Sequence, residues 1–129
     1  MLIDGYLCAI EHTVQAGAVS EAVTLAAALP EICSALELPN LRSSPARYIG
    51  WCEAWLEERG APDAEEPLTG MFLYHLHTAG MIPRQLCCAT REEFEQFVCR
   101  ALIKAAWRWY RQCGAEDLTV QQALGRSAQ

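Results

Sequence analysis

Two histidines, His75 and His77, form the closest pair of imidazoles in the sequence. On a helix, residues two positions apart point about 200° away from each other, so the two rings could not bind one metal ion. On a strand or in a distorted turn they could, with Cys87 or Cys88 to complete the site. Because histidines beside an apolar stripe are more often packed and hydrogen-bonded, we predict neither a metal site nor a cofactor.

Seven cysteines are scattered along the sequence, at positions 8, 33, 52, 87, 88, 99 and 113. Most of them fall on apolar positions of expected helices, where cysteine behaves as a small hydrophobic residue. No Cys-x-x-Cys pair and no pair of histidines three to five residues apart is present, so the spacing of a zinc finger is missing. We therefore expect reduced core thiols in a cytoplasmic protein rather than a disulfide framework.

Basic residues recur along one edge of a single expected helix. They are Arg100, Lys104, Arg108 and Arg111, spaced four, four and three apart, with Trp107 beside them. One interpretation is a binding edge for phosphates or acidic groups, with the indole available to stack. The alternative is a solvated helix face, or internal pairing with the acidic region 53–66. We favour the alternative, because the net charge of the chain is −6 and would oppose a polyanion.

The basic edge belongs to a long helix whose two ends are marked in the sequence. Thr90 and Glu93 form a capping box, acidic residues gather in the first turns and basic residues follow, as the helix macrodipole favours. Gly114 supplies the left-handed position at which helices commonly stop. An apolar arc covers more than half of the circumference. We therefore expect a central helix near residues 91–113, with other helices packed on two or three sides.

Shorter helices are expected on both sides of this central helix. They run from Asp4 to Ala16 with Gly17 as the stop, from a cap at Ser20 with a kink or restart at Pro30, from Ser44 and Pro45 to about Arg59, from Thr69 to Gly80, and from 118 to 124. No alternating run is long enough for a convincing strand. The predicted fold is all-α: a single compact bundle of five to six helices over residues 1–124, with a frayed tail at 125–129.

The composition fits a compact domain. Hydrophobic residues make up 52% of the 129 residues, which excludes disorder and fits one domain. No apolar run approaches the roughly 20 residues that span a bilayer, and the N-terminus lacks the basic start and apolar core of a signal peptide. We expect a cytoplasmic protein without membrane contact.

Four pieces of the sequence, taken together and in order, are similar to a known family. They are residues 22–33 with Leu36 and Glu37, residues 47–51, Trp55 with Leu56, and residues 68–70 with 74–76. In this combination they resemble a group of small, uncharacterised bacterial proteins that look HEPN-like, and the resemblance covers residues 5–80. HEPN domains are all-helical bundles found in RNA-cleaving toxins, in abortive-infection systems and in non-catalytic relatives of both.

The resemblance also implies where an active site would lie. In the family an Arg is followed four to six residues later by a His on one helix, and members typically dimerise to cleave RNA without a metal. In this sequence His77 replaces the expected Arg, and Met81 and Ile82 stand where the His is expected. No other Arg has a His four to six residues downstream. The resemblance therefore implies a degenerate member that keeps the scaffold and lacks the catalytic pair.

We predict a non-catalytic helical module that binds a protein partner, either another protein or a second copy of itself, in a defence, inhibitor or antitoxin-type system. The first alternative is an atypical, metal-independent ribonuclease that uses His75, His77 and the basic helix edge, with RNA as the partner. The second is an acidic inhibitor that mimics nucleic acid. The sequence contains no phosphate-binding loop, no nucleophile elbow and no triad spacing, so the two histidines are the only candidates for catalysis.

Overall fold

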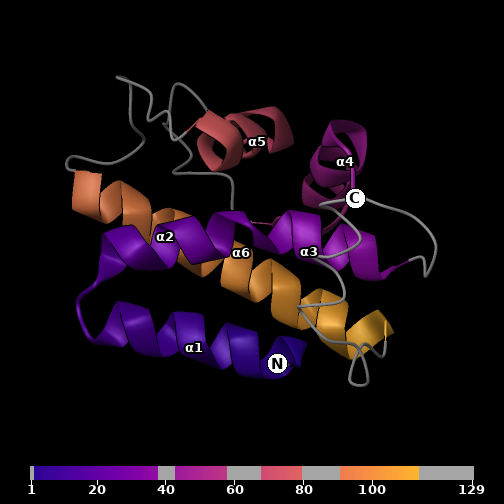
Figure 1. Ribbon diagram of the computed structural model, residues 1–129. Coiled ribbons are helices and arrows are strands. Elements are labelled where there is room, and N and C mark those ends of the chain that lie inside the picture. Colours follow the sequence, from indigo (N-terminus) through magenta and orange to yellow (C-terminus); the bar gives the residue numbers. More distant parts are fainter. Residues whose placement is uncertain (1, 38–42, 58–67, 80–90, 114–129) are drawn as a thin grey trace.

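The computed structural model describes residues 2–37, 43–57, 68–79 and 91–113. In chain order its helices are α1 (Ile3–Gln15), α2 (Val19–Ala27), α3 (Leu29–Leu36), α4 (Pro45–Trp55), α5 (Gly70–Ala79) and α6 (Arg91–Cys113) (Figure 1). The 23 residues of α6 make a helix about 35 Å long. The predicted all-α bundle with a long helix at 91–113 is confirmed.

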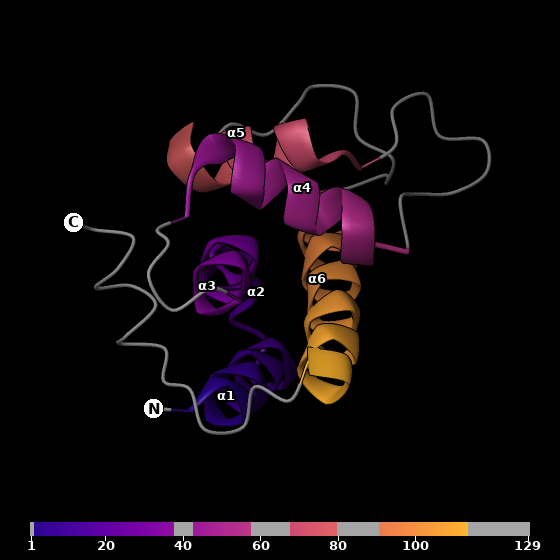
Figure 2. The same cartoon turned by 90° about the vertical axis from the view of Figure 1, so that its right-hand side faces the viewer.

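The helices form three levels beside α6. In Figure 2, α1 lies at the bottom, α2 and α3 lie above it, and α4 and α5 lie across the top. Helix α6 runs along one side of this stack and packs against α1, α2, α3 and α4. The wide apolar arc that the sequence predicts for α6 is therefore covered by four neighbouring helices.

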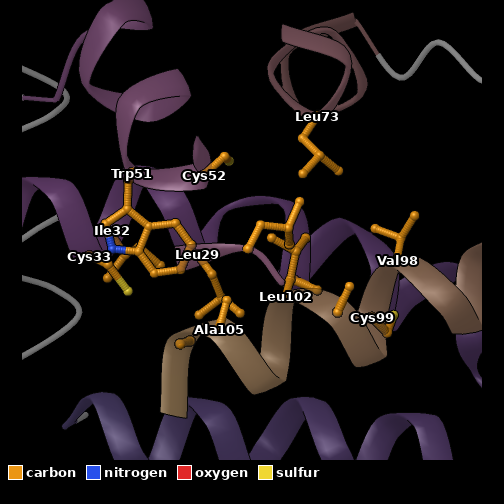
Figure 3. Close-up of a cluster of buried hydrophobic side chains, with 14 of the residues drawn as sticks. Leu29, Ile32, Cys33, Trp51, Cys52, Leu73, Val98, Cys99, Leu102 and Ala105 are labelled. Carbon is orange, nitrogen blue, oxygen red and sulfur yellow. The ribbon is translucent and has the colours of Figure 1, made fainter. Parts of the chain in front are cut away.

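The hydrophobic core includes residues from each of the helices α1 to α6, and part of it lies between α3, α4, α5 and α6. Figure 3 shows Ile32, Trp51, Leu73 and Leu102, one from each of these helices, turned toward a common interior. Each of the four side chains is at most 3% exposed. The Trp51 side chain of α4 is therefore part of the core.

Two tyrosine hydroxyl groups tie the levels together. The hydroxyl of Tyr48, a residue only 1% exposed, lies 2.5 Å from the carbonyl oxygen of Ala27 in α2 and 3.1 Å from that of Leu73 in α5. The half-buried Tyr6 donates its hydroxyl hydrogen to the carbonyl of Leu25 at 2.8 Å, which joins α1 to α2. Both hydroxyl groups thus form hydrogen bonds between helices rather than within one helix.

Three helix ends are as the sequence predicts. Gly17 has a φ of +87°, and this left-handed conformation ends α1. The Ser44 side chain accepts a hydrogen bond from the backbone N–H of Arg47 at 3.2 Å and caps α4. In the same way, Thr69 Oγ1 accepts from the N–H of Phe72 at 3.0 Å and caps α5.

The predicted cap at Ser20 is wrong. Helix α2 already begins at Val19, and Ser20 instead donates from Oγ to Glu95 Oε1 at 3.2 Å, which joins α2 to α6. This tertiary hydrogen bond competes with the local cap. The break near Pro30 is confirmed as a restart: Ala28 separates α2 from α3, and Pro30 sits in the first turn of α3.

One further helix end differs from the prediction, and others cannot be compared. Helix α4 ends at Trp55, before the predicted end near Arg59, because Leu56 is extended with a ψ of 119°. The predicted cap at Thr90, the stop at Gly114, Cys87 and Cys88, the helix at 118–124 and the tail at 125–129 lie outside the described residues.

One apolar stretch, Val19–Leu36, is long and apolar enough to cross a membrane by length and composition. The sequence alone predicted that no apolar run approaches the roughly 20 residues that span a bilayer, whereas this stretch has 18 residues. In the structure it forms two helices, α2 and α3, and 67% of it is buried. A core helix of a soluble protein and a signal sequence near the N-terminus both meet the same criterion, so the stretch alone selects neither.

Candidate functional site

The basic edge of α6 is divided between two neighbouring helices. Trp107 Nε1 donates to Glu11 Oε1 of α1 at 2.7 Å. On the other side, Arg108 Nη1 donates to the carbonyl oxygen of Trp55 in α4 and to Glu57 Oε1, both at 2.9 Å. Neighbouring positions on a helix point about 100° apart, so these two residues face different partners.

Arg108 fastens α6 to the end of α4. Its guanidinium carbon lies 5.6 Å from the centre of the Trp55 ring. The Trp55 carbonyl is one of the last four of α4, which lack partners within the helix. Its contact with Glu57 confirms, for this one residue, internal pairing with the acidic region 53–66. Arg108 therefore supports the fold rather than an edge for ligands.

Trp107 is half-buried against α1. Its ring also packs edge-on against Tyr110, with ring centres 5.6 Å apart. The only hydrogen-bond donor of the indole is used by Glu11. This position fits packing between α1 and α6 better than the predicted role as a stacking surface. The exposed Arg111 lies one turn beyond, toward the C-terminal end of α6.

A groove of about 400 Å³ lies between α1 and α6. Its apolar lining includes Val14 of α1 together with Cys99 and Ile103 of α6, and its α6 edge carries Arg100 and Lys104. The volume is at the lower end of the roughly 300–1,000 Å³ typical of ligand pockets. Two of the five predicted binding residues, Arg100 and Lys104, are thus brought to one concave surface.

The α1 edge of the groove has a different character. It carries Glu11 and Gln15, so a carboxylate and an amide face the two cations across the groove. The guanidinium of Arg100 also lies over the ring of Phe97, with its central carbon 5.4 Å from the ring centre. The groove therefore has an apolar floor, a basic edge on α6 and a mildly acidic edge on α1.

Cys99 contributes an inert surface to this floor. The residue is 1% exposed. Burial, and then the nearby Glu95 carboxylate, raises the pKa of Cys99 to about 12 from its ordinary value of 9.0. The thiol is therefore neutral at pH 7 and is not a nucleophile, because the thiolate is the reactive form.

The two histidines of α5 point in different directions, as the helical spacing predicts. His75 is exposed beside Tyr74, whereas the His77 ring stacks on Tyr48 with ring centres 5.5 Å apart. His77 Nε2 lies 3.0 Å from Glu31 Oε2 of α3, so one carboxylate orients this imidazole. Among the described residues, no group of three or more His, Cys, Asp or Glu side chains could hold a metal ion.

The histidines and the groove are not parts of one site in the described structure. Helix α5, with His75 and His77, lies at the top of the stack in Figure 2, and α1, which forms one wall of the groove, lies at the bottom. Helices α2 and α3 lie between them. The joint use of these histidines and the basic edge, which the ribonuclease alternative requires, has no geometric support here.

The sequence did not indicate the α1 half of the groove. Val14 lies within the first predicted helix, but a local pattern does not say which other helix will cover an apolar residue of that helix. Glu11 and Trp107 are 96 positions apart, and no local signal pairs them. Glu31, the partner of His77, lies 46 positions away from it, and no local signal in the sequence pairs these two residues either.

Comparisons with models of protein families, with curated proteins and with solved structures give no match. The HEPN-like resemblance of residues 5–80 therefore stays a prediction.

Proposed function

We propose that this chain is a non-catalytic protein-binding module and that the α1/α6 groove is its binding surface. The observation that supports this most directly is the apolar floor of Val14, Cys99 and Ile103, bordered by Arg100 and Lys104. An apolar floor with a few charges on its edge is the usual composition of a protein-binding groove. Both walls are packed helices, so the surface is already formed before a partner arrives.

A protein fits this surface better than RNA. Nucleic-acid binders usually carry a basic field over one face, whereas this chain has a net charge of −6. The Glu11 carboxylate on the α1 edge would repel phosphates. Binding of single strands also relies on aromatic side chains that stack with bases, and Trp107 is held against α1 by Glu11.

A role without catalysis agrees with the side chains of the groove. Cys99 is neutral at pH 7, and the described residues that line the groove include no histidine. The HEPN-like resemblance, with His77 in place of the catalytic Arg, also supports a scaffold without chemistry. Under this proposal the chain acts by contact, in a defence, inhibitor or antitoxin-type partnership.

The test is an affinity pull-down of tagged protein from its host, with and without nuclease treatment. The bait is compared with Arg100→Glu and Lys104→Glu, and with Arg47→Glu on α4 as a control with the same change of charge. We expect the wild type to capture a stoichiometric amount of one protein, and this protein should remain bound after nuclease treatment. Arg100→Glu and Lys104→Glu should lose this protein, whereas the control Arg47→Glu should retain it.

Two results would contradict the proposal. Bound material that consists of RNA and disappears on nuclease treatment would support the ribonuclease alternative, and RNA cleavage by the wild type but not by His77→Ala would establish it. A protein partner that all three variants retain equally would place binding on another face. Circular dichroism melts of every variant show whether a loss of binding reflects unfolding.

A further inference from the structure

We propose that Cys8 and His12 of α1 form one half of a zinc site, which a second copy of this chain completes with the same two side chains. This inference goes beyond the proposed function and does not depend on the α1/α6 groove. The two residues are four positions apart in the helix Ile3–Gln15. Residues at this spacing lie about 6 Å apart along the helix axis and about 40° apart around it, so both side chains can reach one metal ion.

Cys8 differs from other cysteines of the chain by its exposure. Of the four cysteines whose side chains the structure describes, Cys33, Cys52 and Cys99 are buried and Cys8 is exposed. Packing explains a buried cysteine, because it behaves as a small hydrophobic residue, but an exposed thiol gains nothing from packing. His12, one turn away from this thiol, is exposed as well. Thiolate sulfur and imidazole nitrogen are the ligands typical of Zn²⁺ in proteins.

The pair lies on the outer face of α1. Ile10, which is fully buried, is two positions from Cys8 and two positions from His12. Residues two positions apart point about 160° away from each other, so both side chains point away from the core. Helix α1 packs against α2 and α6 and is the lowest helix in Figure 2. A metal ion held on this face would lie at the edge of the bundle, where a second molecule can reach it.

The charges of α1 favour a cation on this face. The helix contains neither Lys nor Arg, and it carries Asp4 and Glu11. Asp4 lies one turn before Cys8 on the same side of the helix. His12 lies in the last turn, where the negative end of the helix macrodipole stabilises a positive charge. Both terms act in the same direction as the net charge of −6.

A second copy can supply the missing ligands. Two side chains fill only half of the tetrahedral coordination of Zn²⁺, and in the part of the chain that the structure describes no group of three or more His, Cys, Asp or Glu side chains could hold a metal ion. A two-fold axis through the ion would bring in the same thiolate and imidazole from the partner, because such an interface uses one surface twice. Gly5 and Ala9 lie about 20° and 60° from His12 around the helix, so small residues border the pair where the second α1 would approach.

The experiment is a titration of the full chain with Zn²⁺ in a phosphine reductant, which keeps the thiols reduced, followed by light scattering. We expect a dimer that holds one Zn²⁺ per two chains. Co²⁺ in place of Zn²⁺ should give the intense visible absorption of a tetrahedral site with thiolate ligands. Cys8→Ala and His12→Ala should each lose the dimer and the absorption. His12→Cys, which keeps two ligands at the same spacing, should retain the dimer, and so should His75→Ala, which removes an exposed imidazole from α5.

Four results would overturn the inference. A chain that stays monomeric at every Zn²⁺ concentration has no bridging site. A zinc-dependent dimer that persists in Cys8→Ala or His12→Ala uses other ligands, and one Zn²⁺ bound per monomer would show that a single chain completes the site. A dimer that forms without Zn²⁺ and disappears with the reductant would be a disulfide between two Cys8 thiols. None of these results touches the proposed function, because capture of a groove partner by Cys8→Ala and by the wild type is measured separately in the pull-down.

Discussion

Replacing Tyr48 by Phe tests whether one buried hydroxyl holds three helices together. The hydroxyl has a single hydrogen, and of its two acceptors the carbonyl of Ala27 is nearer, at 2.5 Å, than that of Leu73, at 3.1 Å. Ala27 is the last residue of α2, so its carbonyl has no partner within that helix. Tyr48→Phe keeps the ring, and with it the stacking on His77, but leaves this buried carbonyl without a donor.

The expected loss of unfolding free energy is about 1–3 kcal/mol, the cost of a buried polar group that has lost its hydrogen bond. With a typical urea m-value of about 1–3 kcal/mol/M, the unfolding midpoint should fall by about 1 M at an unchanged m-value. Tyr6→Phe is the matched control. Its hydroxyl donates to the Leu25 carbonyl at 2.8 Å, but Tyr6 is only half-buried, so water can replace the hydrogen bond. An equal loss in both variants, or no measurable loss for Tyr48→Phe, would refute the reasoning.

Two further predictions concern stability. Burial raises the pKa of Tyr6 and of Cys99 to about 12, above their ordinary values of 10.0 and 9.0. The contribution of each group to the free energy of unfolding is therefore complete below its ordinary pKa and is lost as the pH rises through about 12. Urea unfolding between about pH 7 and 11 should show falling stability, and Cys99→Ala should make the fall less steep from about pH 9; an unchanged slope would contradict this. Gly70→Ala should cost about 1–3 kcal/mol, because the added Cβ would lie 2.8 Å from the Ile49 carbonyl oxygen, whereas Gly50→Ala in α4 has nothing within 4 Å and should stabilise by about 0.5–1 kcal/mol. The same loss in both alanine variants would show that space around the Cβ does not decide the effect.

The helices could be predicted because their signals are local. Ser44 and Thr69 cap helices through hydrogen bonds to residues three positions along the chain, and Gly17 ends α1 by adopting a conformation that other residues avoid. Ser20 shows where such reasoning ends. The same residue type forms a hydrogen bond with Glu95, which is 75 positions away, and the local signal loses to a tertiary one.

Only the α6 side of the candidate site could be predicted from the sequence, because the α1 side depends on tertiary packing. The spacing of Arg100, Lys104 and Arg108 identifies one edge of one helix, and the proposed pairing with the region 53–66 correctly anticipated the Arg108 contact to Glu57. It does not indicate that α1 will lie along that edge. The groove depends on which helices pack together, and that is decided by the whole core rather than by α6.

The packing of α6 explains why only part of the basic edge reaches the groove. At about 100° per residue, Arg100 and Lys104 lie between Trp107 and Arg108 around the helix, about 40° apart from each other. Trp107 is bonded to Glu11 on α1, and Arg108 is bonded at the end of α4, so these two contacts fix the rotation of α6 from both sides. Arg100 and Lys104 are consequently presented on a helix that is already fixed. A partner would then lose little free energy in ordering the surface it meets. Removing the hydrogen bond between Trp107 and Glu11 should therefore weaken the binding of a partner to the α1/α6 groove, even though this hydrogen bond lies within the chain.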